Sequence, residues 1–136
     1  MMKQSMMAMI FTLMTMITAM TATAATLEEQ LASYRTQGAG TFDPKAGQTL
    51  WTTSHGTDPE VGEKICTACH LDDPRKPGKH RKTGKIIEPM AISVNPQRFT
   101  DPEKVEKWFL RNCRQVMGRE CTPQEKGDVL SYLGGL

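Results

Sequence analysis

Beyond residue 25 this 136-residue sequence lacks internal repeats, low-complexity tracts and any stretch that alternates polar and apolar residues as a β-strand does. It also lacks a strong net charge, since its 17 Lys and Arg residues are nearly balanced by 15 Asp and Glu residues. A balance so close to neutral gives no indication of nucleic-acid binding. The absence of strand patterns points to an all-α fold, built from a few short helices in one small domain.

The first 25 residues are uncharged except for Lys3, and they hold eight of the ten methionines. They end in a run of small residues at positions 22–25, which is the pattern that signal peptidase accepts. A transmembrane anchor needs about 20 apolar residues, whereas threonines interrupt this stretch repeatedly. We therefore predict a cleaved signal peptide over residues 1–25, export to the periplasm, and a single mature domain over residues 26–136.

Local signals predict four short helices, over residues 26–36, from residue 43, over residues 101–117 and from residue 122. Asp43 and Thr122 are each followed by a proline, which is the combination of an N-cap with a first-turn residue that needs no donor. Glu125 lies three residues after Thr122 and completes the pattern of a capping box. From His70 to Phe99 no apolar period is sustained, and a long loop is predicted.

Cys66, Cys69 and His70 form a C-x-x-C-H motif, the attachment signature of c-type haem. One turn of backbone places the two thiols opposite the haem vinyl groups and the imidazole under the iron. A zinc site would need a second close pair of ligands, and Cys113 and Cys121 are eight residues apart. A redox dithiol would need a βαβ context, which the sequence lacks. We therefore predict one covalently attached haem with His70 as its proximal iron ligand.

The motif leaves the sixth iron ligand undecided. The mature chain offers six candidates: Met90, Met117, His55, His80, Asn95 and Asn112. A sulfur ligand from Met90, in the loop 20 residues past His70, would indicate an ordinary electron-carrying cytochrome c. His55, which precedes the motif, is an equal alternative on position alone. Met117 and His80 have simpler interpretations, as a packing residue and as a solvated imidazole.

Asn112 stands out because of its position on the helix predicted over residues 101–117. It falls seven residues after Val105, inside an apolar stripe of that helix. The members of the stripe are Val105, Trp108, Phe109, Cys113 and Val116. A buried amide needs a partner, and either a haem iron or a neighbouring backbone carbonyl would provide one. Periodicity alone leaves these two interpretations even.

Cys113 and Cys121 are predicted to form a disulfide, because thiols outside the cytoplasm are oxidised, metal-bound or covalently used. An unpaired or metal-bound pair is the alternative. A bridge across so short a loop would contribute about 2–3 kcal/mol to stability. It would also tie the end of the helix that carries Asn112 to the start of the last helix.

The loop after the motif is strongly basic, with no acidic residue from Pro74 to Ile87. Its cations are Arg75, Lys76, Lys79, Arg81, Lys82 and Lys85. Two interpretations stay open: a surface that steers an acidic redox partner, or a solvated loop without a partner.

Residues 88–101 and 105–113 resemble the corresponding segments of the sphaeroides haem protein family, a group of small high-spin monohaem cytochromes c that bind oxygen. The resemblance runs from about residue 50 to the C-terminus and includes the C-x-x-C-H motif and the eight-residue cysteine spacing. It implies a small class I-like cytochrome c fold, with short helices around one covalently bound haem. It further implies that Asn112 is the sixth ligand of ferric iron and that Cys113 and Cys121 are bridged. A related branch, similar to cytochrome c″, has His at the ligand position, so Asn112 argues against that branch.

An amide oxygen is a hard donor that prefers ferric to ferrous iron. Reduction is therefore expected to release Asn112 and to open a site for O2, NO or CO. The resemblance implies that a dihaem or other c-type cytochrome donates the electrons. The alternative is a plain electron carrier with a permanent Met90 or His55 ligand. Reduction of O2 or NO as an enzyme stays open, although no second catalytic group is evident near Asn112.

Overall fold

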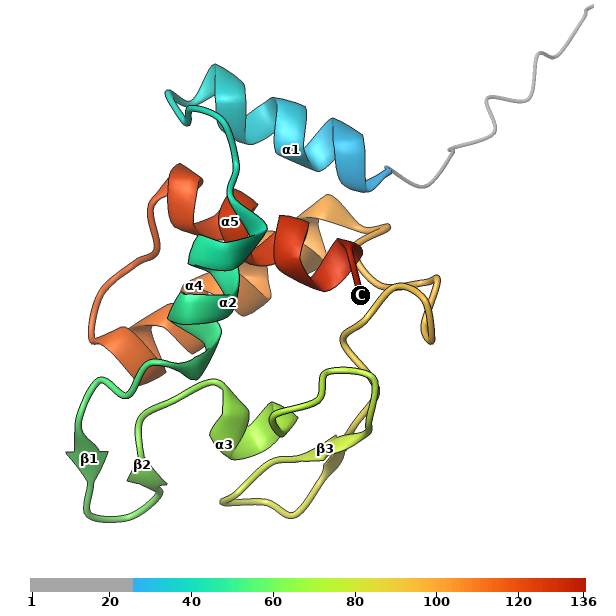
Figure 1. Cartoon of the computed structure of the whole chain (residues 1–136). Helices are drawn as coiled ribbons and strands as arrows, with labels where there is room; N and C mark the ends of the chain where they lie inside the picture. Colours follow the sequence, from blue (N-terminus) through green and yellow to red (C-terminus); the bar gives the residue numbers. More distant parts are fainter. Residues whose placement is uncertain (1–25) are drawn as a thin grey trace, which may run out of the picture.

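The computed structural model describes residues 26–136 (Figure 1), so the predicted signal peptide over residues 1–25 lies outside the described part. Its helices are α1 (Leu27–Thr36), α2 (Pro44–Thr52), α3 (Thr67–His70), α4 (Pro102–Met117) and α5 (Pro123–Gly134). Its strands are β1 (Thr57–Asp58), β2 (Gly62–Glu63), β3 (Gly78–Lys79) and β4 (Ile86–Ile87). Within residues 26–136, no helix combines the length and the apolar character needed to cross a bilayer.

The prediction of an all-α fold is confirmed, and all four predicted helices are present as α1, α2, α4 and α5. The predicted capping box begins α5: the Thr122 hydroxyl accepts the N–H of Glu125 at 3.2 Å, and the Glu125 carboxylate accepts the N–H of Thr122 at 2.8 Å. Asp43 caps α2 by accepting the N–H of Lys45 at 2.8 Å. Short polar side chains therefore satisfy the orphan donors where the sequence predicted helix starts.

Two small antiparallel hairpins, β1–β2 and β3–β4, interrupt the loops on either side of α3. Each strand has two residues, which is too short to produce an alternating pattern, so the sequence could not predict them. The hairpins and α3 lie together on the side of the molecule away from α1 (Figure 1). The β3–β4 hairpin gives structure to part of the long loop predicted after His70.

Helix α5 packs against both α1 and α2 and forms the centre of the helical half (Figure 1). Its Leu130 and Leu133 are almost completely buried. Leu130 belongs to a cluster with Leu31, Tyr34 and Val105, whereas Leu133 belongs to a second cluster with Trp51, Val129 and Tyr132. Burial of these side chains supplies the main stabilising term of a domain this small.

Gly47 permits the close approach of α2 to α5. A Cβ at this position would collide with the carbonyl oxygen of Asp128 and with the backbone nitrogen of Val129. Both atoms belong to the backbone of α5, so neither can move without distorting the helix.

We expect the substitution Gly47→Ala to lower the free energy of unfolding by about 1–3 kcal/mol, as overpacking of a tight contact does. Gly40→Ala is the matched control, because its Cβ would meet only the Gln124 side chain at 3.6 Å. Urea unfolding of both holoprotein variants measures the difference. Equal unfolding midpoints for the two variants would contradict this account of the α2–α5 contact.

Candidate haem site

Helix α3 is a single turn that carries the C-x-x-C-H motif. The carbonyl oxygen of Cys66 accepts the N–H groups of Cys69 at 3.2 Å and of His70 at 3.1 Å. These hydrogen bonds place both thiols and the imidazole around one turn, and neither cysteine is in a disulfide. Leu71 ends the helix with a φ of 63°. The local geometry is the one that covalent attachment of haem needs.

Gly78 on β3 holds the hairpin against this turn. A Cβ at Gly78 would collide with the carbonyl oxygen of Cys69. The guanidinium of Arg81 adds to the contact by donating to the carbonyl oxygens of Ala68 and Val61, both at 3.1 Å. The motif is therefore supported from outside by the basic loop that follows it.

Cys66 and His70 are partly buried. Burial raises the pKa of the Cys66 thiol to about 11. Burial, together with the nearby positive charge of Arg98, lowers the pKa of His70 to about 4. His70 is consequently neutral at physiological pH, which is the state that binds a metal.

Three buried nitrogen atoms within residues 51–70 have no hydrogen-bond partner among the described residues: Nδ1 of His70, Nε1 of Trp51 and Nε2 of His55. The ring of Trp51 lies 5.1 Å from that of His70. Buried polar groups are normally paired, so an unpaired indole N–H beside His70 fits a site that holds a large group with polar substituents. Haem is such a group, and Cys66, Cys69 and His70 are the residues that would hold it.

Three of the six candidate sixth ligands have partners or packing of their own. The Met117 sulfur lies 3.6 Å from that of Cys121. Nδ1 of His80 accepts the N–H of Thr83 at 3.2 Å, and the Asn95 amide donates to the carbonyl oxygen of Pro89 at 3.3 Å. The remaining candidates are Asn112, Met90 and His55.

Asn112 is half-buried on α4, where its carboxamide makes no hydrogen bond to another described residue. Met90 packs against the cluster that contains Trp51, and its N–H donates to the carbonyl oxygen of Pro74 at 2.9 Å. His55 precedes β1, and its N–H donates to the carbonyl oxygen of Lys64 at 2.9 Å. Of these three candidates, only Asn112 lies on a helix, and that helix, α4, belongs to the C-terminal part of the chain.

The predicted apolar stripe on α4 is wrong for Trp108, which is 45% exposed. Val105 and Cys113 are buried and Phe109 packs against both core clusters. The buried edge of α4 is thus narrow, and Trp108 lies beside it, with the Arg111 guanidinium 5.5 Å from its ring. A stripe predicted from apolar residues alone was too wide.

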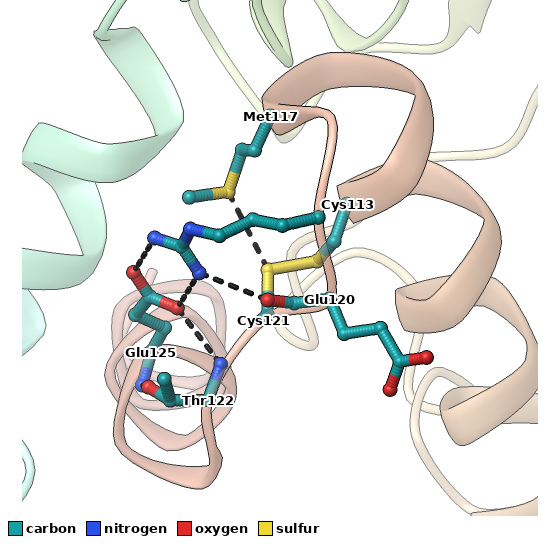
Figure 2. Close-up of polar contacts among 7 residues, drawn as sticks. Cys113, Met117, Glu120, Cys121, Thr122 and Glu125 are labelled. Carbon is teal, nitrogen blue, oxygen red and sulfur yellow. Dashed lines mark hydrogen bonds and ion pairs between the residues drawn. A yellow bond between two sulfur atoms is a disulfide. The ribbon is translucent and has the colours of Figure 1, made fainter.

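Figure 2 shows the connection between α4 and α5, where the sulfur atoms of Cys113 and Cys121 are joined and the Met117 sulfur approaches the bridge. In the same region Arg119 donates to both carboxylate oxygens of Glu125, at 2.8 and 2.6 Å. The end of the helix that carries Asn112 is therefore tied to the start of α5.

The structure separates the cations of the basic loop into two groups. Arg81 supports α3 as described, Lys82 pairs with Glu60 at 3.0 Å, and Arg75 pairs with Asp73 at 3.4 Å. Lys76, Lys79 and Lys85 are exposed and form no ion pair within the described part of the chain. Trp51 and Arg98 are site residues that the sequence did not single out, because one appeared as an ordinary apolar helix residue and the other as one loop cation among several.

Comparisons with known proteins agree with this geometry. A family model described as "Domain of unknown function (DUF1924)" matches residues 37–133. The cytochrome c-type protein SHP of Cereibacter sphaeroides is 58% identical over 52 residues, 38% of this chain and 40% of that protein. Cytochrome c″ of Methylophilus methylotrophus is 45% identical over 60 residues, 44% of this chain and 42% of that protein. The chain thus matches less than half the length of these curated relatives.

Two solved structures are similar over most of their length. That of oxidized SHP, described as an oxygen-binding cytochrome c, is 38% identical with a TM-score of 0.74, covering 82% of this chain and 97% of that chain. That of oxidized cytochrome c″ from Methylophilus methylotrophus is 31% identical with a TM-score of 0.67, covering 79% and 91%.

The fold and the C-x-x-C-H turn define a small c-type cytochrome with one covalently bound haem. The chain belongs to the family that the DUF1924 model defines and to the sphaeroides haem protein family. The resemblance seen in the sequence is therefore confirmed.

The ion pair at the start of α5 should make stability depend on pH. Hydrogen bonds from Arg119 are the largest cause that lowers the pKa of Glu125, to about 2. The pKa of a Glu side chain in the unfolded state is about 4.3. The stability that Glu125 contributes to the folded protein is therefore fully present above about pH 4.3 and is lost as the pH falls towards 2. Glu125→Gln should lower stability at pH 7, and the difference from the native protein should vanish near pH 2. Urea unfolding of the holoprotein across this range measures the difference.

Glu103→Gln is the control, because Glu103 lies on α4 and forms no ion pair within residues 26–136. A stability difference for Glu125→Gln that persists unchanged at pH 2 would contradict the role assigned to the Arg119–Glu125 pair.

Proposed function

We propose that this protein is an exported cytochrome in which Asn112 is a releasable ligand of ferric iron, and in which its release admits O2, NO or CO. The observation that carries the proposal is the half-buried carboxamide of Asn112 on α4, which no described residue holds by a hydrogen bond. The relative with the 38% identical structure is described as an oxygen-binding cytochrome c, which supports the same conclusion.

Bound haem would supply a one-electron redox centre and a coordination position. The chain supplies the ligands: a neutral His70 from α3 and the carboxamide oxygen of Asn112 from α4. A hard amide oxygen favours the ferric state, so reduction should weaken its hold. The freed carboxamide retains an N–H group that can donate a hydrogen bond to a diatomic guest.

The contacts of Met90 favour packing over ligation. Its backbone is held to Pro74, four residues after His70, and its side chain packs against a cluster whose Trp51 lies against the His70 ring. These contacts support a packing role for Met90. We propose that Asn112, from α4, would hold the bound haem together with His70.

We further propose that residues 1–25 are a cleaved signal peptide and that the mature domain functions in the periplasm. The disulfide between Cys113 and Cys121 belongs to the same proposal, since such bonds persist in oxidising compartments. Electrons would come from a dihaem or other c-type cytochrome. The exposed cations Lys76, Lys79 and Lys85 surround the hairpin that packs on α3, and they would attract an acidic surface on that donor.

The Asn112 ligand is tested by visible spectra of the ferric and the dithionite-reduced holoprotein, before and after addition of CO. The native protein should be high-spin when ferric and should respond to CO when reduced. Asn112→His should be low-spin when ferric, because imidazole is a stronger-field ligand. Asn112→Ala should bind added imidazole at least about tenfold more tightly in the ferric state, since no internal ligand has to be displaced.

Met90→Ala and Asn95→Ala are the matched controls, and both should leave the ferric spectrum unchanged. A native spectrum that is low-spin, ignores CO and changes only in Met90→Ala would show that the iron is permanently ligated by sulfur. The protein would then be a plain electron carrier.

Docking of an acidic donor is tested by the rate of reduction of the ferric protein by a reduced acidic c-type cytochrome. The rate should fall as ionic strength rises from about 0.01 to 0.15 M, over which the screening length shortens from about 30 to 8 Å. The double variant Lys79→Gln, Lys85→Gln should lower the rate at low salt. The control double variant Lys45→Gln, Lys104→Gln removes the same charge elsewhere and should lower the rate less. Equal effects of the two double variants would assign the salt dependence to net charge and not to the hairpin.

A further inference from the structure

Helix α4 is attached to the rest of the protein differently from α1, α2 and α5. Helix α5 packs closely on α1 and on α2, whereas the backbone of α4 approaches no other helix to a comparable extent within residues 26–136. Its core contacts come from the narrow edge of Val105 and Phe109. The position of α4 therefore depends strongly on a few specific attachments.

One attachment is a polar network near the start of α4. The hydroxyl of Tyr34 on α1 donates to one carboxylate oxygen of Glu106 at 2.5 Å, and Nζ of Lys126 on α5 lies 2.6 Å from the other. Tyr34 is 2% exposed and the Lys126 side chain is 15% exposed. Burial and the Glu106 carboxylate raise the pKa of Tyr34, which therefore stays a donor. Glu106 thus joins α4 to both α1 and α5.

The second attachment is at the other end of α4. The bridge between Cys113 and Cys121 ties α4 to the segment before α5, and Arg114 pairs with Glu120 at 2.5 Å. Asn112 lies between the two attachments, directly before Cys113 and six residues after Glu106, which is about 9 Å along a helix. A shift of α4 at the Glu106 end would turn the helix about the disulfide and move the Asn112 carboxamide.

We infer that Glu106 is a positioning residue for Asn112: by fixing α4 to Tyr34 and Lys126, it determines how readily the Asn112 carboxamide leaves the iron. The inference rests on the proposed role of Asn112. The Glu106 side chain is 47% exposed. Hydrogen bonds to a charged carboxylate are nevertheless stronger than neutral ones, and loss of Glu106 would leave the buried Tyr34 hydroxyl without its acceptor. The network is therefore a firm attachment whose removal should allow α4 to move.

The test is the rate at which imidazole binds to the ferric holoprotein, because imidazole has to wait for Asn112 to leave. Glu106→Ala and Tyr34→Phe should each raise this rate by about three- to tenfold, the change that loss of one such hydrogen bond produces. Thr26→Ala removes the capping hydroxyl of α1 without touching α4, and Glu103→Ala removes an α4 carboxylate outside the network. Both controls should leave the rate unchanged, although Thr26→Ala lowers stability.

Combination with Asn112→Ala separates the possible failures. The Glu106→Ala and Asn112→Ala double variant should bind imidazole at the rate of Asn112→Ala alone. The positioning role would be overturned if Glu106→Ala raised the rate equally in both backgrounds. It would also be overturned if Asn112→Ala changed the rate but neither Glu106→Ala nor Tyr34→Phe did. Both results would leave the proposed function standing. An unchanged ferric spectrum in Asn112→Ala would instead overturn the proposed function.

Discussion

The rest of the site depends on one turn of helix at α3, where Cys66, Cys69 and His70 have to face the same group at the same time. That turn is too short to be stable alone. Its own backbone hydrogen bonds hold it from within, and the close approach of Gly78 to Cys69 holds it from outside. The basic loop after the motif is consequently part of the support of the site, and not merely a connection between helices.

The helices α4 and α5 are attached to the rest of the protein in different ways. Helix α5 is packed tightly enough to require glycine at position 47, whereas α4, which carries Asn112, is attached through a carboxylate network and a disulfide. Helix α4 is thus packed less tightly than α5, and under the proposed function it carries the ligand that leaves. This division suits a protein in which one ligand has to stay and the other has to leave.

The parts of this structure that follow from local rules could be predicted from sequence. The Thr122 capping box and the C-x-x-C-H turn are short-range patterns, and both were predicted at the residues where they occur. The β3–β4 hairpin, the exposure of Trp108 and the Tyr34–Glu106–Lys126 network could not be predicted. The network joins segments far apart in the chain, the exposure of Trp108 depends on how α4 packs, and the two-residue strands of the hairpin carry no periodic signal. The proposed ligand role of Asn112 rests on the family resemblance, because helical periodicity alone left two possible partners for its amide.

The most direct test is a pair of crystal structures of the holoprotein, ferric and dithionite-reduced, in which the distance between the iron and Oδ1 of Asn112 is measured. The account predicts a direct bond in the ferric crystal and a displaced carboxamide in the reduced one, with His70 bound in both. A Met90 sulfur or a His55 nitrogen bound to the iron in both states would contradict it.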